Sequence, residues 1–186
     1  MDGIQLMIDE HKTIKRMLQV IRSYCLRILN GKEVEGQDVF RMIDFVRNYA
    51  DKHHHGKEED LLFKFMTEEL GATAEKLVRN GMLVEHDLGR LYMRELEEAT
   101  QKMIDGDPEA KVDVIGHAMS YYHLLQRHID KEDGMVYKYG ENNLSKETLE
   151  RVNRETEILE KEAREKGVQE KYERLVDELE KKYVTS

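Results

Sequence analysis

The sequence predicts an all-α protein: an up-down-up-down four-helix bundle with two additional C-terminal amphipathic helices. Apolar residues recur at the spacing of one helix face almost from end to end, and the alternation typical of strands never persists. Only one proline, Pro108, occurs in the 186 residues, so little interrupts long helices. Short breaks rich in Gly, Asn and Asp divide the chain into long segments, and long helices joined by short loops pack as antiparallel neighbours.

Turn-forming residues set the expected ends of the four bundle helices. Asn30-Gly31 ends the first helix, and Gly71 closes the second. Asp105-Gly106-Asp107-Pro108 separates the third helix from the fourth. Its proline predicts that the fourth helix begins there, because proline suits the first turn of a helix. The predicted helices cover residues 4–29, 39–65, 74–104 and 109–139.

The composition changes after Gly140-Glu141-Asn142-Asn143, where Glu, Lys and Arg become dominant. Two narrow apolar stripes, separated at Gly167, predict two amphipathic helices. We therefore divide the chain into a bundle, residues 1–140, and a charged helical extension, residues 141–186. The extension either packs back on the bundle or presents an apolar seam to a second copy or a partner protein.

Composition also restricts the function. The 39 acidic and 30 basic side chains leave a net charge of −9, against the basic face that nucleic-acid binding requires. No apolar run is long enough to span a bilayer. The single cysteine, Cys25, permits no internal disulfide, and the first residues lack the layout of a signal peptide. We expect a cytoplasmic protein that binds neither nucleic acid nor membranes.

An internal repeat draws attention to the histidines. Residues 54–65 and 128–139, 74 positions apart (128 minus 54), share the pattern His-x-x-Lys-Glu-acid-x-apolar-apolar-aromatic-Lys-aromatic. Glu10-His11 and Glu85-His86 form a second pair at almost the same offset. Each half of the bundle therefore contributes one Glu-His helix and one His-x-x-x-Glu helix, as two helical hairpins related by a pseudo-twofold axis would.

The spacing of these residues predicts a metal site. His54 with Glu58, and His128 with Glu132, lie four residues apart and so share one helix face. Their neighbours on that face are apolar, and burying imidazoles and carboxylates is costly unless they are paired or bound to metal. With His11 and His86, which also fall in apolar stripes, the donor set suits Fe, Mn or Zn rather than Ca or Mg.

At these residues the chain resembles the hemerythrin-like, or HHE cation-binding, family. The likeness covers about residues 4–140, and its most specific pieces are Glu10-His11, His54-His55-Gly56-Lys57-Glu58-Glu59, Glu85-His86 and His128-Ile129-Asp130-Lys131-Glu132-Asp133. The resemblance implies a four-helix bundle holding two Fe ions joined by an oxo or hydroxo bridge, with Zn or Mn as alternatives. It makes His11, His54, His86 and His128 terminal ligands, and Glu58 and Glu132 bridging carboxylates.

The sequence departs from the oxygen-carrying hemerythrins at one position. Their third helix carries two histidines four residues apart, whereas here His86 is followed at that spacing by Arg90. Arginine does not ligate metals, so we expect one nitrogen ligand fewer and one more open metal position. Arg90 would lie on the ligand face and hold a carboxylate or an anion. Glu10 and Glu85 are candidates to accept hydrogen bonds from ligand imidazoles.

The other histidines are not predicted to bind metal. His53 and His55 flank His54 and point about 100° to either side of it in an α-helix. His117 and His123 lie off the ligand face. Asp133 is an alternative to Glu132 as the bridge, with Glu132 preferred. Tyr49, Tyr121 and Tyr122 are candidates for a hydrogen bond near the metals, and spacing does not choose among them.

The predicted function is a cytoplasmic di-iron protein that binds or senses dioxygen, nitric oxide or peroxide, or that handles iron. One alternative is an oxidoreductase that reduces peroxide, nitric oxide or dioxygen at the same centre. Another is an interaction protein whose metal is structural and whose C-terminal helices form a homodimer or bind a partner. Ferritin-like storage is disfavoured, because those sites use Glu-x-x-His rather than His-x-x-x-Glu.

Overall fold

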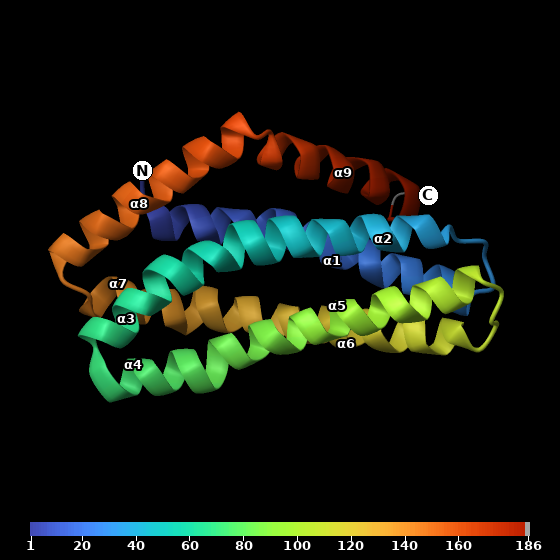
Figure 1. Ribbon diagram of the computed structural model, residues 1–186, viewed down its shortest axis with the longest axis horizontal. Helices are drawn as coiled ribbons and strands as arrows, with labels where there is room; N and C mark the ends of the chain where they lie inside the picture. Colours follow the sequence, from blue (N-terminus) through green and yellow to red (C-terminus); the bar gives the residue numbers. More distant parts are fainter. Residues whose placement is uncertain (185–186) are drawn as a thin grey trace.

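The computed structural model describes residues 1–184. Within that range the chain forms six continuous helices joined by short loops, and no strand (Figure 1). The first is α1 (Gly3–Leu29). The second combines α2 (Gly36–Phe45), η1 (Val46–His55), η2 (Glu58–Leu62) and α3 (Phe63–Glu69). The third combines α4 (Gly71–Leu77), η3 (Val78–Met82) and α5 (Leu83–Ile104), and the fourth α6 (Ala110–Lys131), η4 (Glu132–Val136) and α7 (Tyr137–Asn143). The last two are α8 (Lys146–Glu165) and α9 (Val168–Tyr183).

Local sequence explains where these helices begin and end. The Asp2 carboxylate accepts a hydrogen bond from the Gln5 amide and caps α1, and the Ser145 hydroxyl caps α8 in the same way. Gly71, at φ +69°, and Gly167, at φ +67°, adopt the left-handed conformation that glycine tolerates best. They separate the second helix from the third and α8 from α9. The predicted all-α bundle is confirmed.

The fourth helix is longer than predicted, because Gly140 serves packing rather than termination. The helix continues to Asn143 instead of ending near Tyr139. A Cβ atom on Gly140 would lie only 3.1 Å from Met66 Sδ and 3.3 Å from Leu62 Cδ1. Glycine here lets the fourth helix approach the second one closely.

The two C-terminal helices lie along the outside of the bundle (Figure 1). Helix α9 contacts α1, α2 and η1, while α8 contacts α1 and η2. The α9 stripe is buried there through Tyr172, Leu175, Val176, Leu179 and Tyr183. The extension therefore packs back on the bundle with its apolar side inward. In the range 1–184 no helix is both long and apolar enough to cross a membrane.

The core is divided into two apolar clusters along the bundle axis. One cluster includes Ile14, Ala50 and Leu125, and the other includes Met7 and Leu61. The predicted ligand positions fall between them on each helix: His11, for example, lies between Met7 and Ile14 in sequence. A layer of buried imidazoles and carboxylates thus separates two dry regions of the core.

Candidate metal centre

The polar layer brings together all six predicted metal ligands. They form two overlapping clusters, in each of which the candidate ligand atoms lie within 4.8 Å of one another. Every member is at most 6% exposed. Glu58 belongs to both clusters. One cluster is His11, His54, Glu58 and Glu132; the other is His55, Glu58, His86 and His128.

The two glutamates lie between imidazoles of different clusters. Glu58 Oε1 is 3.7 Å from His54 Nε2, and its Oε2 is 3.5 Å from His86 Nε2. Glu132 Oε2 is 3.4 Å from His11 Nε2, and its Oε1 is 2.9 Å from His128 Nε2. Each carboxylate therefore presents one oxygen to each cluster, as a carboxylate shared by two metal ions must.

His55 lies in the metal cluster, although the α-helical spacing predicted that it would point away. It is 6% exposed, and its ring stacks on that of His86 with 3.9 Å between centroids. The reason is the π-helical backbone of η1, whose wider turns change the direction of successive side chains. The internal repeat also indicates that position 55 is buried, because its equivalent is Ile129, an apolar core residue.

With His55 the centre has five imidazoles, and each is held by a carboxylate at its Nδ1 atom. The separations range from 2.7 to 3.3 Å. An Nδ1–H that donates to a carboxylate leaves the Nε2 lone pair for a metal ion. The expected contacts of Glu10 and Glu85 are present, while three others were not predicted. The pairs are His11–Asp133, His54–Glu10, His55–Asp51, His86–Glu59 and His128–Glu85.

Asp133 and Glu132 are clearly distinguished by these contacts. The Glu132 carboxylate is fully buried between the two clusters, whereas Asp133 lies outside them and binds Lys15 as well as His11. Glu132, rather than Asp133, is therefore the carboxylate that faces both clusters.

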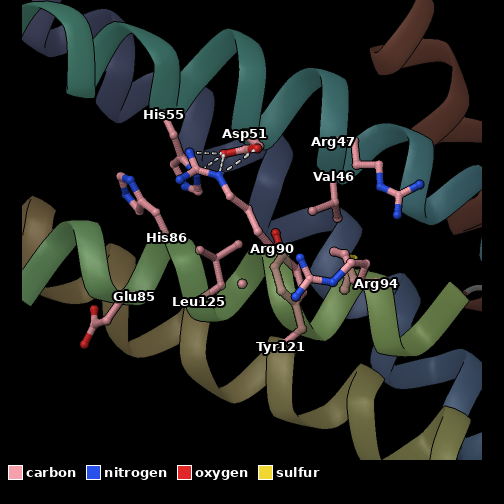
Figure 2. A pocket seen from close by; sticks show the side chains of 12 residues that line it. Val46, Arg47, Asp51, His55, Glu85, His86, Arg90, Arg94, Tyr121 and Leu125 are labelled. Carbon is pink, nitrogen blue, oxygen red and sulfur yellow. Dashed lines mark hydrogen bonds and ion pairs between the residues drawn. The ribbon is translucent and has the colours of Figure 1, made fainter. Parts of the chain in front are cut away.

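Arg90 holds two of the carboxylates that orient the imidazoles. Its guanidinium donates to Asp51 at 2.7 to 3.1 Å and to Glu59 at 2.7 Å. Figure 2 shows it extending from α5 towards Asp51 on η1. Arg90 does hold carboxylates, as its position on the ligand face suggested. The fifth imidazole of the clusters comes from His55 and not from the position of Arg90.

Arg90→Gln is expected to weaken metal binding by about 10- to 100-fold, as loss of groups that orient ligands does elsewhere. Without the guanidinium, Asp51 and Glu59 are free to move, and they hold His55 and His86. Competition with a chromophoric chelator would measure the change. Arg127→Gln, on an exposed position of α6, is the matched control. Equal affinities in the two variants would contradict the role given to Arg90.

The unpaired atoms of the centre match what a metal ion binds. His11 Nε2, His54 Nε2, Glu58 Oε2 and Glu132 Oε2 are buried without a hydrogen-bond partner. Burial lowers the pKa of His54 to about 4, so its ring is a neutral donor at pH 7. Burial and the nearby Glu132 charge raise the pKa of Glu58. Inward-facing nitrogen and oxygen donors of this kind fit a pair of transition-metal ions.

The other three histidines, which the sequence did not predict as metal ligands, lie outside the two clusters. His117 is paired with Glu95 at 3.1 Å, and His123 is exposed. His53 faces a separate buried cluster with Glu10 and Glu160, but the cation within it is the Lys57 ammonium group. That cluster is therefore a salt-bridge network rather than a third metal site.

The tyrosine that donates a hydrogen bond to the clusters is not one of the three that the sequence analysis named. Tyr137, which spacing had not singled out, donates its hydroxyl to Glu58 Oε1 and stacks on His11 with 5.7 Å between ring centroids. Its repeat equivalent is Phe63, which stacks near His86 and has no hydroxyl. The Glu58 and Glu132 carboxylates, which both face the two clusters, thus have different surroundings.

Comparison with known families agrees with this geometry. The family model for the hemerythrin HHE cation binding domain matches residues 2–139, which hold all the clustered imidazoles together with Glu58 and Glu132. The chain matches no curated protein and no solved structure. A family match over well above half of the chain, together with two buried His/Glu clusters, shows that the chain belongs to the hemerythrin HHE cation-binding family.

Proposed function

We propose that the protein binds two iron ions and uses them to bind or sense dioxygen, nitric oxide or peroxide. The observation that carries the proposal is the pair of buried clusters that share Glu58, with Glu132 also facing both. Five imidazoles and two carboxylates form a donor set that suits iron, and Mn or Zn are the competing ions. The buried, unpaired Cys25 fits a reducing cytoplasm.

The chain's own residues prepare the site in three ways. The carboxylates at Nδ1 fix the imidazole tautomers and aim the Nε2 atoms inward. The apolar clusters on either side shield the polar layer from water along the bundle axis. Glu58 and Glu132, which each face both clusters, would hold two cations close together and offset their charge. When bound, iron would supply reversible one-electron chemistry and an open position for a small ligand.

A reductase acting on peroxide, nitric oxide or dioxygen is the second candidate. A cavity of about 250 Å³ beside His55 and His86 favours it, since an enzyme needs room for a substrate near the metals. An interaction protein with a structural metal has less support, because the apolar side of α9 is buried within the chain.

Metal analysis and absorption spectra of protein purified without oxygen test the proposal. We expect about two iron ions per chain, as a two-metal site requires. A visible ferric band should develop on exposure to air, and a distinct spectrum with nitric oxide. One zinc ion per chain and no visible band would rule the proposal out. Catalytic turnover with an added reductant would separate the enzyme from the sensor.

Tyr137→Phe is expected to lower the reduction potential of the iron centre by roughly 50 mV. The Tyr137 hydroxyl withdraws charge from Glu58 by hydrogen bonding, so its removal makes Glu58 a stronger donor and favours the ferric state. Spectroelectrochemical titration measures the shift. Tyr139→Phe, two residues along the same helix, should leave the potential unchanged. An unaltered potential in both variants would show that the hydrogen bond does not tune the centre.

A further inference from the structure

A cavity of about 250 Å³ opens between η1 and α5, over α6 (Figure 2). His55 and His86 form its inner side, so it lies directly beside one of the two metal clusters. A water molecule occupies roughly 30 Å³ in the liquid, so the cavity has room for about eight non-hydrogen atoms. A small organic molecule fits there, next to the imidazoles.

The walls of this pocket are partly apolar. Val46 from η1, Met93 from α5 and Leu125 from α6 contribute side chains. Gly89 contributes none, and a Cβ atom there would lie 3.4 Å from Tyr121 Cε2. The absence of a side chain at Gly89 keeps the floor of the pocket open beside the tyrosine ring. A ligand with a short hydrocarbon portion matches these walls.

The carboxylates of the pocket are already engaged. Asp51 accepts from Arg90 and lies 3.3 Å from His55 Nδ1. Glu85 pairs with His128 and Lys131. A cationic ligand would therefore have to displace an existing partner to bind here.

Two hydrogen-bond donors remain uncommitted. The Tyr121 hydroxyl is buried without a hydrogen-bond partner, and the residue is 2% exposed. Figure 2 shows its ring rising from α6 with the hydroxyl towards Arg90. Arg94 lies at the exposed side and has no ion-pair partner within the described residues, whereas neighbouring Arg47 is paired with Glu97. Because a buried hydroxyl without a partner is costly, a ligand that brings an acceptor gains free energy here.

We propose that this pocket binds a short-chain organic carboxylate. Its oxygens accept hydrogen bonds from the Tyr121 hydroxyl and the Arg94 guanidinium, and its hydrocarbon portion packs against Val46, Met93 and Leu125. The pocket places such a ligand beside His55 and His86. Its action as a substrate or effector of the iron rests on the proposed function, but its binding rests on the pocket alone.

Calorimetric titration of the metal-loaded protein with butyrate and hexanoate tests the proposal. Ligands of this size are expected to bind with dissociation constants on the order of 1 mM. Butanol and butylammonium, which match butyrate in length but lack the negative charge, should bind at least about tenfold more weakly. Tyr121→Phe and Arg94→Gln should each weaken butyrate binding about tenfold, as loss of one hydrogen bond to a charged group does.

Matched controls separate pocket binding from general effects. Tyr122→Phe removes a hydroxyl that accepts a hydrogen bond from Gln19, away from the pocket. Arg22→Gln removes an exposed guanidinium on α1. Both should bind butyrate like the parent. Butanol binding as tightly as butyrate, or equal losses in the control variants, would overturn the proposal. Iron per chain is measured on the same samples, so failure of the di-iron assignment is seen separately from failure of carboxylate binding.

Discussion

Glu58→Gln is expected to reduce bound iron from about two ions to fewer than one per chain, because both subsites of a two-metal centre lose a shared ligand. The Glu58 carboxylate faces His54 on one side and His86 on the other. Its amide replacement carries no charge to offset two cations. Glu68→Gln, exposed on the same helix, should retain full iron content.

Although it loses iron, the same variant should be more stable than the parent when both proteins are free of metal. Burial and the Glu132 charge raise the pKa of Glu58, so its ionised form destabilises the folded state. Below the pKa of about 4.3 that Glu58 has in the unfolded chain, the carboxyl is protonated and does not lower the free energy of unfolding. That free energy falls as pH rises from this value towards the higher pKa of Glu58 in the folded state. Glutamine is uncharged at every pH, so at pH 7 the metal-free variant should be more stable than the metal-free parent.

Thermal unfolding with and without iron measures both effects. We expect Glu58→Gln to raise the melting temperature of the metal-free protein at pH 7 and to lower that of the iron-loaded protein. At about pH 3 the metal-free difference should disappear, because the parent carboxyl is then almost fully protonated in both states. A change in melting temperature of the same sign with and without iron would contradict a metal-bridging role for Glu58.

Lys57→Met is expected to lower the free energy of unfolding by about 3 kcal/mol, the size seen when one partner of a buried ion pair is removed. Lys57 is 1% exposed and binds both Glu10 and Glu160. Methionine fills similar space but leaves two buried carboxylates without a cation. Urea unfolding gives the change, and Lys52→Met, exposed one turn earlier, should change stability little.

This substitution should also weaken the metal centre and loosen α8. Glu10 holds His54 at 2.8 Å, and Glu160 lies on α8, so Lys57 links the C-terminal extension to a candidate ligand. Hydrogen bonds from His53 and His54 lower the pKa of Glu10 despite its burial, so the carboxylate stays charged and needs a cation. The double variant Lys57→Met/Glu160→Gln should recover part of the lost stability. No recovery would show that Glu160 does not couple to Lys57.

Helical periodicity and the internal repeat predicted much of the fold and of the centre. The i,i+4 pairs fixed which faces carry His54, Glu58, His128 and Glu132, because geometry within a helix is local. The two Glu-His positions added the remaining imidazoles of the predicted set. The fourth helix was predicted too short because a glycine used for close packing looks the same in sequence as one that ends a helix.

By itself, therefore, the sequence determined the helical bundle and placed six candidate donors in two related halves. Only the tertiary structure decided that His55 faces the buried His/Glu clusters, because the π-helical turns of η1 break the α-helical spacing used for the prediction. It also decided which carboxylate holds each imidazole and that Glu160 reaches Lys57 from 103 residues away. Such contacts depend on how helices approach one another, and spacing within one helix does not encode that approach.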